Sequence, residues 1–257
     1  MMRRIGAFAQ RNAQEILRDA LSYIFCLGFP LVMLVIMTLV DQSIPPEAGM
    51  TIFRIDNLSG GIAIFGQMFV MLFTAISVAR DRSGAFLLRL FSSPMTPMDF
   101  ILGYMLPMLV IALLQAGLLL VFSLGVSLLT GTALSLGGVL LSVLPLTPSA
   151  VFFIGLGLLF GTLCNDKAAP GLCSIIISLG AFLGSIWFDA QTTGGVLLDI
   201  SRCLPFLYCT ASVRAAMQLR LTWEALWLPL LIVTCSAALT ALLAAVAFRW
   251  RMRAELA

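Results

Sequence analysis

Residues 101–129 read ILGYMLPMLVIALLQAGLLLVFSLGVSLL and contain no charged side chain. Because a helix rises ~1.5 Å per residue and the hydrocarbon core of a bilayer is roughly 30 Å thick, about 20 such residues span it. The whole chain has the same character: its 257 residues are 61% hydrophobic and 11% charged, with a mean hydropathy of +1.07. Soluble domains are about 45–50% apolar and about 25% charged. The sequence therefore predicts a membrane protein.

Outward from this stretch, further apolar segments long enough to span a bilayer lie on both sides. The predicted spans, none of which carries a charged residue, are 21–40, 60–79, 101–129, 136–164, 170–188 and 225–248. The third and fourth are longer than a bilayer requires, and tilt or bends at Pro107, Pro145 and Pro148 would absorb the excess. We expect an all-α fold, a six-span transmembrane helical bundle that forms one domain over residues 1–257.

The basic residues predict the orientation of the bundle. An even number of spans puts both termini on one side, and most of the basic residues fall in the segments of that side: Arg3, Arg4, Arg11, Arg18, Arg80, Arg82, Arg89, Lys167, Arg249, Arg251 and Arg253. The opposite side holds only Arg54, Arg202, Arg214 and Arg220. Since excess Lys and Arg mark the cytoplasmic side, we expect a multi-pass protein of the cell (inner) membrane with both termini in the cytoplasm.

Short amphipathic helices are expected outside the spans. Residues 1–20 carry apolar residues at helical spacing between arginines, which is typical of a helix on the inner leaflet. On the exterior side, residues 189–224 predict two short interfacial helices separated at Pro205. Cys203 and Cys209 share that loop, and they could form a disulfide if it is extracellular.

The composition argues against several classes of function. The chain has no His, no CxxC pair, no phosphate-binding loop around its single lysine, Lys167, and no carboxylate within a span. We therefore expect no enzyme activity, no metal site, no cofactor bound by this chain and no nucleic-acid partner. Ion-coupled carriers usually place ionisable residues in the membrane. A non-transporting membrane scaffold or assembly protein, and an ion-coupled carrier with an uncharged site, remain alternatives.

The segment between the second and third spans predicts a short cytoplasmic helix. It reads ARDRSGAFLLRLFSSP at residues 79–94, with Phe86, Leu87 and Leu90 on one face. Ser83 is placed to begin the helix and Pro94 to end it. Such an apolar face suits docking in a groove of a partner protein, and resting on the lipid surface is the alternative.

This segment resembles the coupling-helix signature of type-2 ABC transporter permeases. The matching pattern is Asp81-Arg82-Ser83-Gly84, then Leu87 and Leu90, Ser93-Pro94 and Gly103. The exterior Pro205-Phe206-Leu207-Tyr208 and Arg214-Ala215-Ala216 also resemble that family. Some positions depart from its pattern: Ser83 stands where the family often has an acid, and Tyr104 where it often has a lysine. At the exterior end of the fifth span, Trp187-Phe188-Asp189 stands where the family usually has a proline-containing turn.

The resemblance implies the membrane-spanning permease subunit of an ABC exporter that moves a hydrophobic or amphipathic substrate. It implies two partners, an ABC ATPase subunit that binds ATP and Mg, and a second permease subunit that is either a copy or a different chain. The implied ATPase-docking residues are Arg80, Asp81, Arg82, Gly84, Phe86, Leu87, Leu90 and Pro94. The implied substrate pathway, for which helix packing is the alternative role, includes Phe69, Phe73, Thr74, Ser178 and Phe182.

Overall fold

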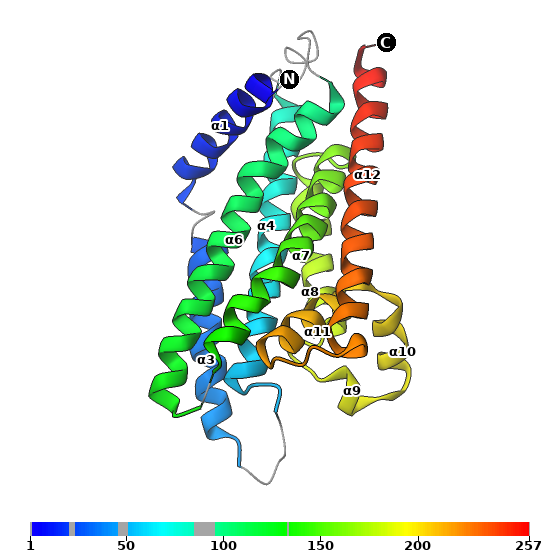
Figure 1. The fold of residues 1–257 in the computed structure, drawn as a ribbon. Coiled ribbons are helices and arrows are strands. Elements are labelled where there is room, and N and C mark those ends of the chain that lie inside the picture. Colours follow the sequence, from blue (N-terminus) through cyan, green and yellow to red (C-terminus); the bar gives the residue numbers. More distant parts are fainter. Residues whose placement is uncertain (1, 21–23, 46–50, 85–95, 133, 257) are drawn as a thin grey trace.

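The computed structural model of the protein describes residues 2–20, 24–45, 51–84, 96–132 and 134–256. Within these ranges the regular structure is helical throughout (Figure 1). The elements are α1 (Met2–Arg18), η1 (Ile24–Gly28), α3 (Phe29–Ser43), α4 (Ile55–Ser83), α6 (Pro97–Thr130), α7 (Leu136–Leu163), α8 (Ala168–Leu183), α9 (Ala190–Thr193), α10 (Gly195–Cys203), α11 (Pro205–Met217), η3 (Trp223–Trp227) and α12 (Leu228–Leu256). The prediction of an all-α bundle is confirmed.

Five helical stretches in the described ranges are long and apolar enough to cross a membrane: Ile24–Ser43, Ile55–Ser83, Pro97–Thr130, Leu136–Leu163 and Trp223–Arg251. They coincide with the predicted first to fourth and sixth spans. The predicted fifth span, 170–188, is the shorter apolar helix α8, whose 16 residues extend over about 24 Å. This helix ends five residues earlier than predicted, because the chain turns at Gly184 and Ser185 has a positive φ of 55°.

Both termini lie at one end of the bundle, together with the end of α4 and the start of α6 (Figure 1). We call this the terminal end. Helices α9, α10 and α11 gather at the opposite end, which we call the far end. The predicted arrangement, with both termini on one side and residues 189–224 on the other, therefore matches the shape of the bundle.

Helix α4 lies at the centre of the bundle. In its most hydrophobic part, 72% of the residues are buried, against 22% in the stretch Trp223–Arg251 that contains most of α12. Its neighbour α7 approaches it closely because Gly157 and Gly161 face the α4 backbone. A Cβ at Gly157 would lie 2.4 Å from the Met71 carbonyl oxygen, and one at Gly161 would lie 2.6 Å from that of Ala75. Small residues of this kind allow helices to pack backbone to backbone in membranes.

The helices of the far end differ from the prediction in one respect. Helices α10 and α11 meet at 90° next to Pro205, as the proline predicts. However, α11 does not lie on the bundle as an interfacial helix. It packs against α4, α7 and α12, and its buried residues include Cys209 and Ala216. The two cysteines of this region are both free, Cys209 buried in α11 and Cys203 exposed at the end of α10.

Candidate functional site

Asp81 lies in the last turn of α4. The resemblance implies that it docks the ATPase, but only 6% of the residue is exposed. Its carboxylate accepts two hydrogen bonds from Arg11 of α1, from Nη1 to Oδ2 at 2.6 Å and from Nη2 to Oδ1 at 3.0 Å. The Tyr104 hydroxyl of α6 donates to Oδ2 at 2.7 Å. A buried carboxylate needs such partners, because an unpaired one would lose its hydration without compensation.

The Arg11 guanidinium is tied to this carboxylate and also pairs with Glu15 on its own helix at 2.8 Å. Burial by itself lowers the pKa of Arg11, but the hydrogen bonds and the charge of Asp81 outweigh that effect, so the pKa lies above its usual value. Arg11 therefore stays protonated at every physiological pH and remains a charged donor to Asp81.

Helix α1 is seated on α6 by a close contact at Gly103. The Phe8 ring covers this glycine, and a Cβ there would lie 2.2 Å from Phe8 Cδ1. The same ring meets Phe100 and Tyr104 edge to face at 5.7 and 5.0 Å. The Asn12 amide donates to the Gly103 carbonyl at 3.1 Å. The glycine that opens the third span in the family pattern thus makes room for the N-terminal helix.

Arg82 extends from the end of α4 to the end of α7. It donates from Nη1 to the Thr162 carbonyl and from Nη2 to the Cys164 carbonyl, the latter at 2.7 Å. Arg251 of α12 donates to the Leu163 carbonyl at 3.3 Å. The last carbonyls of a helix have no partner within it and carry partial negative charge, so two arginines here satisfy them.

The predicted docking residues therefore divide into four groups. Asp81 and Arg82 are engaged within the chain, whereas Arg80 is exposed. Gly84 ends α4, and its N–H donates to the Arg80 carbonyl at 3.0 Å. The remaining residues predicted to dock the ATPase fall outside the described residues: Phe86, Leu87, Leu90 and Pro94.

After residues 85–95, which are not described, α6 begins with a capping box. The Thr96 hydroxyl accepts from the Asp99 N–H at 3.3 Å, and the Asp99 carboxylate accepts from the Thr96 N–H at 2.9 Å. This arrangement satisfies two of the free donors at the start of α6. Gly84 and Thr96, the described residues nearest the predicted helix on either side, are thus held by hydrogen bonds.

The residues predicted to line a substrate pathway lie in different surroundings. Phe69 and Phe73 belong to a partly exposed stripe of α4, and Phe25 contacts both of their rings, with centroids 6.3 and 6.4 Å away. Ser178 and Phe182 lie on the exposed face of α8.

Thr74 is fully buried, and its hydroxyl donates to the Val70 carbonyl at 2.7 Å. Its side chain faces Gly157 of α7. The structure therefore brings Phe69 and Phe73 together on one stripe, and it puts Thr74 in the packing between two helices.

The family described as ABC-2 type transporter matches residues 3–218 of this chain. The chain belongs to the ABC-2 type transporter family. Two curated relatives from Escherichia coli, of strain K12 and of O157:H7, both bear the name "Probable multidrug ABC transporter permease YbhR". Each is 25% identical over 180 residues, which are 68% of this chain and 48% of the relative. The chain spans about half the length of the curated relatives it matches.

Family membership and the apolar helices together make the chain a multi-pass membrane component of an ABC transporter. In this ABC-2 chain, the sequence interpretation missed Arg11 and Tyr104, the two residues that donate hydrogen bonds to Asp81. Tyr104 carried a signal, because it was noted as a departure from the family pattern, and its hydroxyl donates to Asp81. Arg11 carried none beyond its place on an amphipathic helix.

Proposed function

We propose that this chain is the membrane-spanning subunit of an ATP-driven exporter that moves a hydrophobic or amphipathic substrate out of the cell. A separate ABC ATPase subunit would bind ATP and Mg and dock against residues 80–94 from the cytoplasm. A second permease subunit, a copy or a different chain, would complete the transporter. Family membership and the multidrug permease name of the relatives support this assignment.

The observation that carries the proposal is the way the end of α4 is held. Asp81 and Arg82 connect it to α1, α6 and α7 within one turn of Gly84. Coupling requires that the ATPase bind two states of the permease unequally. A docking segment that leaves from a firmly held helix end transmits its displacement to several helices at once, which is what such a mechanism needs.

The substrate would pass along the partly exposed stripe of α4 and the exposed face of α8. Phe69, Phe73 and Phe182 offer apolar and aromatic surface there, and Ser178 offers a single hydroxyl. This surface carries no charge, so it suits hydrophobic or amphipathic cargo such as drugs, antibiotic peptides or lipid-like molecules. Charged hydrophilic cargo would find no counter-charge on it.

Co-purification with the ATPase subunit tests the docking assignment. We expect Gly84→Glu and Leu87→Glu to abolish the association, because each puts a bulky charge on the proposed surface. The matched control is Thr192→Glu, an exposed position at the far end. Retention of the ATPase by both docking variants would refute the docking surface.

Stimulation of ATP hydrolysis tests the class of cargo. We expect the reconstituted complex to be stimulated by hydrophobic drugs, and we expect Phe182→Ala to weaken this response without changing the basal rate. Stimulation restricted to strongly charged hydrophilic compounds would contradict the proposed cargo.

A further inference from the structure

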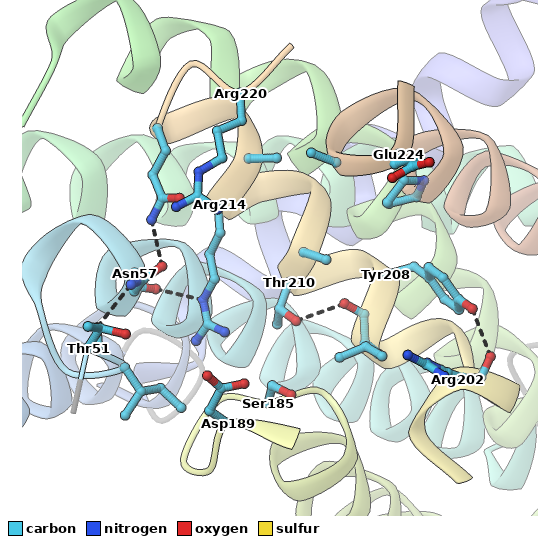
Figure 2. A pocket seen from close by; sticks show the side chains of 17 residues that line it. Thr51, Asn57, Ser185, Asp189, Arg202, Tyr208, Thr210, Arg214, Arg220 and Glu224 are labelled. Atoms are coloured by element: carbon cyan, nitrogen blue, oxygen red, sulfur yellow. Dashed lines mark hydrogen bonds between the residues drawn. The ribbon is translucent and has the colours of Figure 1, made fainter. Parts of the chain in front are cut away.

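The far end of the bundle contains a polar cavity of about 400 Å³ (Figure 2). Its walls come from α11, from residues 185–189, from α10 and from the start of α12, with residues near the beginning of α4 closing one side. The volume lies in the range of small-molecule sites, roughly 300–1,000 Å³. The transport function proposed above does not involve this cavity.

Arginines are concentrated at this cavity. The far end of the chain holds four basic residues, and three of them, Arg202, Arg214 and Arg220, line the cavity. The fourth, Arg54, is not part of the lining and approaches Asp56 at 3.6 Å. Two carboxylates, Asp189 and Glu224, also line the cavity, so the guanidinium groups leave it net positive.

Arg214 is built into the wall rather than extended over the surface. Its Nε donates to the Asn57 carbonyl at 3.0 Å, and Gly61 leaves room for its guanidinium group. The Nη2 nitrogen is shielded from solvent and has no hydrogen-bond partner among the described residues. Figure 2 shows the guanidinium group pointing toward the neighbouring Asp189 carboxylate. A guanidinium group held in this way is positioned to donate hydrogen bonds to an anionic ligand.

The cavity is framed by strained backbone and by tryptophans. The two described non-glycine residues with positive φ are Ser185, which lines the cavity, and Leu219, which precedes Arg220. Such strain collects at binding sites because the surrounding structure must maintain it. Next to Glu224, the side chains of Trp223 and Trp227 are 63% and 45% exposed. Tryptophans are enriched at the headgroup level of the bilayer, which favours a position of the cavity near the lipid phosphates.

From these observations we propose that the far-end cavity binds a phosphate group, supplied by the headgroup of a phospholipid. Arg214 and Arg220 lie on one side of the cavity and Arg202 on the other (Figure 2). Arg220 binds the phosphate oxygens, Arg214 provides positive charge behind it, and Arg202 adds to the positive potential of the cavity. Arginine suits this role because its planar fork donates two parallel hydrogen bonds to phosphate and stays charged. The Glu224 carboxylate, which also lines the cavity, adds a place for the ammonium group of a zwitterionic headgroup.

Native mass spectrometry of the purified chain in a non-ionic detergent tests the proposal without an ATPase, so its result is independent of the proposed transport function. The probes are phosphatidylethanolamine, phosphatidylglycerol and a diacylglycerol with the same acyl chains but no phosphate. We expect the first phospholipid to bind at least about tenfold more tightly than diacylglycerol. We expect Arg220→Met to weaken its binding by about tenfold, as loss of a charge-assisted hydrogen bond implies, and Arg202→Met to weaken it less, because only a more distant charge is lost.

The control variant is Arg54→Met, which removes a far-end arginine outside the cavity and should leave phospholipid binding unchanged. Arg202 and Arg220 are exposed, so their variants remain informative even if Arg214→Met does not fold. Equal binding of diacylglycerol, or an equal loss in Arg54→Met, would overturn the proposal. Equilibrium dialysis with labelled inorganic phosphate separates the sources: binding that needs Arg220 but no lipid would overturn the headgroup as the source.

Discussion

Replacing Gly157 by alanine should separate the two central helices. Gly157 of α7 faces the backbone of α4, where a Cβ would lie 2.4 Å from the Met71 carbonyl oxygen and 2.8 Å from Thr74 Cβ. Neither obstacle is the far end of a flexible side chain. The added methyl group therefore cannot be accommodated by a rotamer change, and the helices must move.

The magnitude follows from this geometry. Ordinary van der Waals contact begins at 3.4 Å, so α4 and α7 must part by about 1 Å near Met71. Overpacking of this kind costs about 1–3 kcal/mol. Alanine is a better helix former than glycine by about 1 kcal/mol in an exposed helix, which offsets part of that cost. A loss of 1 kcal/mol lowers the melting temperature of a chain of this size by roughly 2–4 °C.

Thermal melting in detergent, followed by tryptophan fluorescence, provides the measurement. Gly117→Ala is the matched control, because a Cβ at this position of α6 would meet nothing within 4 Å. We expect Gly157→Ala to melt several degrees below the wild type, and Gly117→Ala to melt at or above it. If the two variants melt together, the inference of a backbone-to-backbone contact between α4 and α7 is wrong.

Other predictions concern the terminal end and the cysteines. Tyr104→Phe should reduce stability by about 1.5–3 kcal/mol, since it removes a buried hydrogen bond to a charged acceptor. In a double-mutant cycle with Asp81→Asn, stability is measured by thermal melting. The losses of the two single variants should sum to more than the loss of the double variant, because both substitutions weaken the same hydrogen bond. Additive losses would contradict the contact. Thr96→Ala should cost about 1 kcal/mol through loss of the cap, and unchanged melting would argue against the capping box. A membrane-impermeant maleimide should label Cys203 in intact cells and leave Cys209 unlabelled until denaturation; labelling of Cys203 only in inverted vesicles would reverse the orientation.

The long helices were predictable because their signal is local. Twenty or more consecutive apolar residues have one physical solution in a bilayer, a helix, and the five long stretches appear where hydropathy puts them. The end of α8 was not predictable in the same way. The residues after Leu183 remain apolar, and the turn at Ser185 depends on a positive φ that hydropathy does not encode.

The position of α11 was missed because only one of its faces was considered. The apolar stripe through Leu207 and Ala215 predicted an interfacial helix. The residues between, such as Ser212 and Ala216, are small enough to be buried as well, and α11 is therefore enclosed by neighbouring helices.

The burial of Asp81 depends on a partner that is distant in sequence. Its ion-pair partner Arg11 lies 70 positions earlier, on a helix whose periodicity indicated only a surface position. Charge patterns in one sequence do not show which charges meet across a bundle. For this reason the interpretation assigned Asp81 and Arg82 to an external partner, whereas the structure engages both within the chain. Whether residues 85–94 dock an ATPase stays a prediction.

The contacts of Asp81 and Arg82 have a mechanical consequence. One helical turn contains bonds to α1, α6 and α7, so an axial load applied at Gly84 cannot bend α4 alone. The stiffness that resists such a load therefore belongs to α1, α4, α6 and α7 together, and α4 and α7 also pack against α11 at the far end. In the proposed mechanism, substitutions at Arg11 or Arg82 would weaken the mechanical connection between the ATPase and the neighbouring helices, while leaving residues 85–94, the proposed docking segment, unchanged.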